Sequence, residues 1–233
     1  MGICQKSYVK GLGRKLREQI LKKPSSTFTR NLQKDLWIIS PTSKRTNGEA
    51  HMLVKKERQS DFFDTCSQCK TNYSCCHETT PPITRERRKI IESYLKAEKV
   101  SVEEPFVESE YVFPRLDADG FCVFHDRKTR KCLIHSVKPE TCVAGPITFD
   151  INVGNRKIEW FVKMEKICPL AGVVYRNREL LRRHVESARR EILRLVSELD
   201  SEALKAVLKK DEPETFKIGV ENIGADVLRK LRG

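Results

Sequence analysis

The sequence predicts a small α+β fold, in which a cysteine-rich core of short strands and helices is followed by a helical C-terminal segment. Short extended runs alternate with turn residues between residues 111 and 164, which is typical of antiparallel strand pairs. Apolar residues then recur at helical spacing over residues 176–209. The chain of 233 residues also contains nine cysteines, and eight of them fall between residues 66 and 168.

Composition divides the chain into three expected regions. Residues 1–51 are a basic N-terminal extension and linker, residues 52–170 the cysteine-cluster domain, and residues 171–233 the helical C-terminal segment. Residues 1–60 hold 14 Lys and Arg against 4 Asp and Glu, a net charge of +10 out of +13 for the chain. Within the linker, Leu36-Trp37-Ile38-Ile39 is an apolar island, too short to fold alone and expected to pack on the domain.

The basic N-terminus is compatible with RNA or another anionic surface as a partner, and equally with a solvated basic tail. No apolar run approaches the roughly 18–20 residues of a membrane span, so no transmembrane segment is expected. The N-terminus also lacks the apolar stretch and cleavage site of a secretory signal. We therefore expect a cytoplasmic protein.

In the cysteine-cluster domain, the first predicted helix covers residues 85–98. Thr84 is its expected N-cap, and Ile90, Ile91, Tyr94 and Leu95 are its expected buried face. Residues 111–114 and 121–124 are expected to be extended and joined by the turn at 117–120, and residues 126–130 form a second turn before a strand at 132–134. Residues 147–153 and 157–164 are predicted to form a hairpin around Gly154-Asn155.

The C-terminal segment is predicted from one apolar stripe, with an interruption at Asp200 and Ser201. A last helix is expected over residues 219–231. His184 falls among arginines of the long helix and is expected to be solvated. The stripe consists of Leu180, Leu181, Val185, Ala188, Ile192, Leu195, Val196 and Leu199.

The first cysteine group follows the pattern C-x2-C-x5-C-C, formed by Cys66, Cys69, Cys75 and Cys76. A C-x2-C turn directs two thiolates inward, which suits zinc and iron–sulfur clusters alike. Adjacent cysteines such as Cys75 and Cys76 rarely bond to each other, and both can bind metal. The pattern favours metal ligands over disulfides.

The second group is dispersed along the chain and consists of Cys122, Cys132, Cys142 and Cys168. Cys122 and Cys132 lie on strands that are predicted to be neighbours, so their side chains can converge. Cys142 follows a turn at Pro139, and Cys168 precedes Pro169. Cys4 stands apart in the basic segment and is expected to be a free thiol.

The order of these cysteines, and the prolines that lie between and after them, resemble the pattern of the zinc- or iron-chelating cysteine-cluster family, the YkgJ-like proteins. The resemblance covers about residues 62–170, including the run from Cys132 through Pro139-Glu140 to Cys142 and Pro146. His135 stands where the family often has Tyr, as a ligand or as a ring that fills the same place. The resemblance implies metal chelation. Flagellin lysine methylases are similar in carrying such a cysteine set, so a methyl-transfer role is conceivable.

Eight clustered cysteines equal two four-thiolate sites, which suit structural Zn²⁺ or an iron–sulfur cluster. An iron–sulfur cluster would permit a redox or methyl-transfer-type role. The alternative is a structural-zinc module that contacts RNA or ribonucleoprotein through the basic N-terminal arm. The chain lacks G-x-S-x-G, H-E-x-x-H, P-loop and Rossmann glycine patterns and the C-x3-C-x2-C of radical enzymes, so no catalytic residue is assigned.

Overall fold

A computed structural model describes residues 75–210 and 214–232, all of which belong to one compact unit, residues 40–233. The described residues form six α-helices and three small antiparallel sheets, which confirms the α+β prediction. None of the helices within these ranges is long and apolar enough to cross a membrane. The basic extension, Cys4, Cys66 and Cys69 lie outside the described residues.

The N-terminal part of the described chain packs around helix α4 (Arg85–Ala97). Thr84 caps this helix as predicted, since its side-chain oxygen accepts a hydrogen bond from the Arg87 amide. Ile91 and Leu95 are buried, whereas Ile90 is exposed. Ile91 and Leu95 form a core cluster with Ile83, which precedes the helix, and with Phe124 and Ile134, which follow it.

Two short sheets follow α4. Strand β1 (Phe106–Glu108) pairs with β2 (Val112–Pro114), and β3 (His125–Asp126) pairs with β4 (Lys131–Cys132). The predicted turn at 117–120 joins the two segments through hydrogen bonds of Asp117 to Phe121 and of Val123 to Arg115, whereas β2 itself pairs with the preceding segment 106–108. Residues 121 and 122 make only isolated bridges, to His77 and Leu116.

A third sheet has the order β5–β6–β7 and is antiparallel throughout. Strands β5 (Ile147–Asn152) and β6 (Lys157–Lys163) form the predicted hairpin. Strand β7 (Thr215–Asn222) was not predicted, and residues 219–222 belong to it rather than to the last helix. That helix, α9 (Ala225–Arg232), starts later than expected.

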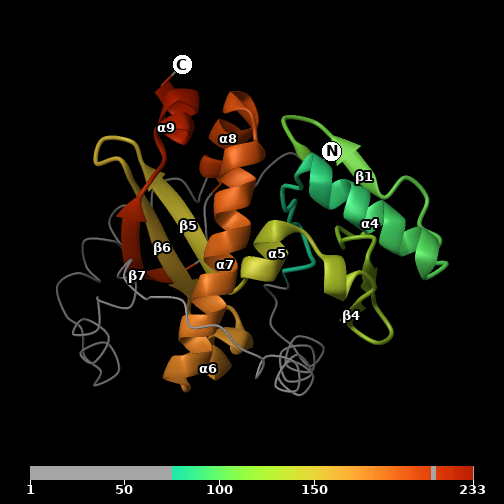
Figure 1. Cartoon of the computed structure of the whole chain (residues 1–233). Coiled ribbons are helices and arrows are strands. Elements are labelled where there is room, and N and C mark those ends of the chain that lie inside the picture. The colour runs from blue at the N-terminus through green and yellow to red at the C-terminus, as the bar shows by residue number, and fades with distance from the viewer. Residues whose placement is uncertain (1–74, 211–213, 233) are drawn as a thin grey trace, which may run out of the picture. The chain divides into compact units, whose positions relative to one another are not determined.

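Helix α7 (Arg178–Glu198) runs between the sheet on one side and α4 and α5 on the other (Figure 1). It contacts β5, α5 (Glu140–Ala144), α6 (Pro169–Tyr175) and α9. Its predicted stripe is buried except at Leu180, which is only half-buried. The helix ends at Glu198, and Asp200 caps α8 (Ser201–Leu208), as the interruption at this point predicts. The 3₁₀ turn η2 (His135–Val137) contacts α4.

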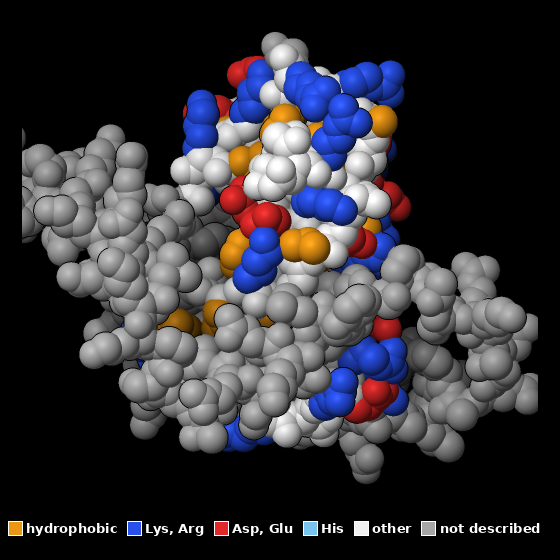
Figure 2. Space-filling view, turned by 90° about the vertical axis from the view of Figure 1, so that its left-hand side faces the viewer, with side chains coloured by type: hydrophobic (Ala, Val, Ile, Leu, Met, Phe, Trp, Pro, Cys, Tyr) orange, Lys and Arg blue, Asp and Glu red, His pale blue; other side chains and the backbone are white. Residues whose placement is uncertain are grey.

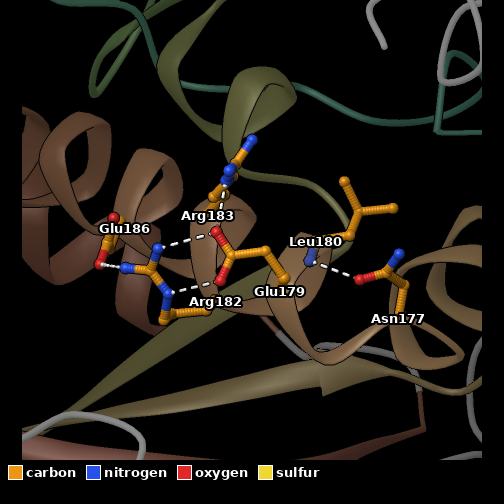
Figure 3. A network of polar contacts seen from close by, with 6 residues as sticks. All are labelled: Asn177, Glu179, Leu180, Arg182, Arg183 and Glu186. Carbon is orange, nitrogen blue, oxygen red and sulfur yellow. Dashed lines mark hydrogen bonds and ion pairs between the residues drawn. The ribbon is translucent and has the colours of Figure 1, made fainter. Parts of the chain in front are cut away.

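The start of α7 is stabilised by a local polar network (Figure 3). The Asn177 side chain accepts a hydrogen bond from the Leu180 amide at 3.0 Å. Glu179 accepts from Arg182 and Arg183, and Arg182 also binds Glu186. Such exposed ion pairs contribute little stability each, but a negative Glu179 in the first turn suits the positive end of the helix dipole.

Side chains of α7 and the sheet meet in a second polar contact. The indole nitrogen of Trp160, a fully buried residue of β6, donates to Glu221 Oε1 at 3.1 Å. Arg189 of α7 donates from Nε to Glu221 Oε2 at 2.6 Å and from Nη2 to the same oxygen at 2.5 Å. The unpredicted strand β7 therefore connects the hairpin to the long helix.

On the face seen in Figure 2, Lys and Arg side chains gather at the end of the molecule formed by α8 and α9, where α9 ends in Arg229, Lys230 and Arg232.

Candidate metal centre

Six of the eight predicted ligand cysteines lie in the described residues, and all six are free thiols. They come from four different places in the fold. Cys75 and Cys76 precede α4, Cys122 and Cys132 belong to the β3–β4 region, Cys142 lies in α5, and Cys168 is the N-cap of α6.

Backbone hydrogen bonds bring three of these cysteines together. The Cys122 amide donates to the Cys76 carbonyl at 2.8 Å, and the His125 amide donates to the Cys122 carbonyl at 2.8 Å. His125 is in turn the register partner of Cys132. The predicted convergence of Cys122 and Cys132 thus arises through a tight turn and a two-residue strand pair rather than through two longer neighbouring strands.

Gly120 allows the first of these contacts. Its φ of +82° is unfavourable for any residue with a side chain, and a Cβ there would approach His77 Nε2 to 3.3 Å. His77 accordingly lies against this turn, with Nε2 at 3.1 Å from the Asp119 carbonyl. The turn at residues 117–120 was predicted, and it fixes the chain next to Cys76.

The described cysteines interact electrostatically. Burial raises the pKa of Cys122, to about 12, and also raises those of Cys132, Cys142 and Cys168. The charge of Cys75 raises the pKa of each of these four thiols further. Because such an effect decreases with distance, Cys75 lies within reach of thiols from β4, α5 and α6 at once.

Cys75 itself behaves in the opposite way. Its pKa is lowered to about 6 because the thiol of Cys76 donates a hydrogen bond to it and because Lys138 and Lys163 are near. The pKa of Cys76 is raised, since its proton is held in that hydrogen bond and its thiol is partly buried. Near neutral pH the pair therefore carries one thiolate, on Cys75.

Cations fit this donor set chemically, because a thiol loses its proton when it binds metal and a positive charge favours the thiolate form. Within residues 75–210 and 214–232, however, no group of three or more Cys, His, Asp or Glu side chains is arranged to hold a metal ion. These residues thus supply a concentration of thiols rather than a complete coordination sphere. The C-x2-C pair, Cys66 and Cys69, lies outside them.

Sequence reasoning missed several residues around the thiols. Lys138 and Lys163 flank Cys75 electrostatically, yet nothing in their local sequence marks them. The expectation that His184 is solvated is wrong, because its Nε2 lies 3.2 Å from the Ala144 carbonyl and 3.0 Å from the Gly145 carbonyl. For His135, burial lowers the pKa to about 4, so its imidazole is neutral at physiological pH.

Comparison with known proteins agrees with this concentration of cysteines. Residues 65–169 match the family model described as "Putative zinc- or iron-chelating domain", with the motif name CxxCxxCC. The matched stretch, a little less than half of the chain, is similar to that family. The cysteine-cluster domain is therefore a metal-binding one, with zinc or iron as its metal, as the motif order indicated.

One relative is an uncharacterized protein of Methanocaldococcus jannaschii, MJ0661, which is 29% identical over 94 residues. The match covers 38% of this chain and 50% of that protein, so the chain spans about half the length of the curated relative. No solved structure matches.

Proposed function

We propose that the protein binds its metal in one continuous all-thiolate centre that holds more than one metal atom. The proposal rests on the backbone contacts that bring Cys76, Cys122 and Cys132 together. The electrostatic effect of Cys75 on thiols from three separate elements supports it. A single tetrahedral zinc takes four thiolates, whereas the sequence offers eight clustered cysteines. The proposed ligands are Cys66, Cys69, Cys75, Cys76, Cys122, Cys132, Cys142 and Cys168.

The metal decides the biological role. An iron–sulfur cluster bound by these thiolates would supply one-electron chemistry, which supports a redox or methyl-transfer-type role in a reducing compartment such as the cytoplasm. Zinc would supply folding free energy and no electron transfer. The adjacent pair Cys75 and Cys76 is compatible with a multinuclear centre, in which two neighbouring thiols serve different metal atoms.

Single serine substitutions test the ligand assignment. We expect Cys69→Ser, Cys132→Ser and Cys142→Ser each to lower the bound metal per chain, because each leaves an open coordination position. Cys4→Ser is the matched control and should keep the wild-type content. The measurement is elemental analysis of anaerobically purified full-length protein, and equal metal in Cys4→Ser and Cys142→Ser would contradict the assignment.

A second candidate function rests on charge, since residues 1–60 carry +10 of the net +13. In this function a structural zinc centre supports a basic arm that contacts RNA. We expect removal of residues 1–30 to abolish RNA binding and to leave the metal content unchanged. High salt on the full-length chain should have the same effect on binding, because phosphate contacts weaken steeply with salt. RNA affinity that persists without residues 1–30 would contradict this function.

A further inference from the structure

Cys142 lies in a helix that is too short to be stable on its own. Helix α5 has five residues, Glu140–Ala144, and isolated helices below about 12 residues are marginal in water. At both ends such a helix leaves backbone groups without intrahelical partners. The position of Cys142 therefore depends on groups that hold α5 from outside.

The first end of α5 is held from α4. The Glu140 side chain is fully buried, and its Oε1 accepts a hydrogen bond from the Thr84 hydroxyl at 2.6 Å. The Nε of Arg87 lies 3.7 Å from the same oxygen, and the Nη2 of Arg87 lies 2.5 Å from Glu191 Oε2 in α7. A buried carboxylate is costly unless it is paired, so α5 begins where Thr84 can donate to Glu140 Oε1 and Arg87 lies within ion-pair distance of the same oxygen.

The second end is held from α7. His184 Nε2 is within hydrogen-bond distance of the carbonyls of Ala144 and Gly145. Carbonyl oxygens only accept, so Nε2 carries the proton and donates. Two of the carbonyls at the end of α5 are satisfied in this way by one side chain from a helix of 21 residues.

We propose that Glu140 and His184 are positioning residues for the metal centre, which hold α5 at its two ends and so place Cys142 for metal binding. The inference rests on the proposed role of Cys142 as a ligand. Both residues act through the helix and neither needs to touch the metal. Groups that orient metal ligands typically change metal affinity by about 10- to 100-fold when they are removed.

The experiment measures Co²⁺ binding to the metal-free full-length chain under anaerobic conditions, followed by the thiolate-to-cobalt charge-transfer band. We expect His184→Leu to lower the Co²⁺ affinity about 10- to 100-fold. His184→Gln, whose amide can still donate to the carbonyls, should restore most of that loss. Arg190→Leu, at an exposed position of the same helix, is the control and should bind as the wild type does.

A double variant separates positioning from general stability. In the Cys142→Ser background His184→Leu should cause no further loss of affinity, because the ligand through which His184 acts is gone. An equal further loss in that background, or wild-type affinity of the single His184→Leu variant, would overturn the inference. Wild-type affinity of Cys142→Ser alone would instead overturn the ligand assignment of the proposed function.

Glu140→Gln tests the other end of α5 and does not depend on whether His184→Leu folds. The substitution is nearly isosteric and keeps an oxygen for Thr84, but it removes the negative charge beside Arg87. We expect Glu140→Gln to lower the Co²⁺ affinity, as His184→Leu does. Wild-type affinity of a folded Glu140→Gln protein would contradict the role of Glu140.

Discussion

At the scale of single residues, Cys75 differs from the other described cysteines because its pKa is lowered, to about 6, rather than raised. It is also exposed, and exposed thiolates are the reactive form of cysteine. In metal-free protein we expect Cys75 to be alkylated faster than Cys122, whose pKa is about 12. The rate at Cys75 should rise with pH up to about 6 and then level off, since the thiol is already ionised above its pKa.

Mass-spectrometric mapping of the alkylated cysteines at several pH values makes this measurement. Cys76→Ala removes the hydrogen bond that lowers the pKa of Cys75, so it should slow the reaction at pH 7, whereas Cys76→Ser keeps a donor and should slow it less. Equal alkylation of Cys75 and Cys122 at pH 7 would contradict the assignment of the thiolate.

The spacing of single residues predicted the cysteine set but not the groups around it. C-x2-C and the adjacent pair are local patterns, and they identify ligands without knowledge of the fold. Lys138 and Lys163 affect Cys75, and His184 contacts the end of α5, only through the three-dimensional fold, because all three lie far from these partners along the chain or carry no local signal. Because His184 is surrounded by arginines on its helix, its sequence context predicts that it is exposed to solvent. Its partners, the carbonyls at the end of α5, become evident only in the fold.

At the scale of elements, the sequence predicted those whose signal is local. Thr84 and Asp200 cap helices, and Gly154-Asn155 turns a hairpin. Strand β7 lacks such a signal, because its residues form a strand through pairing with β6. The same holds for β1, whose three residues become a strand only against β2.

The contact of Glu221 with Trp160 and Arg189 makes β7 a testable part of the fold. We expect Glu221→Ala to destabilise the protein by about 1–3 kcal/mol, because it leaves the buried indole N–H of Trp160 without its acceptor. Glu186→Ala removes an exposed ion pair on α7 and should cost less than about 1 kcal/mol. Urea unfolding of both variants compares them, and equal stabilities would contradict the role given to Glu221.

At the scale of the whole molecule, the described fold brings distant parts of the sequence to one thiol-rich region. Cysteines from before α4, from β4, α5 and α6 lie within electrostatic reach of Cys75, although up to 93 residues separate Cys75 from Cys168 along the chain. Such an arrangement holds several potential thiolate ligands together, and a bound cation favours their deprotonation. The zinc- or iron-chelating family of residues 65–169 agrees with this account.

The metal and acid-labile sulfide content of anaerobically purified full-length protein tests the central claim most directly. The account predicts more than one metal atom per chain, bound in a way that the Cys69→Ser and Cys142→Ser variants disturb together. Iron with sulfide, and a visible absorption that bleaches with dithionite, would identify a redox centre, and zinc without colour a structural one. A single metal atom per chain that survives the loss of Cys142 would contradict the account.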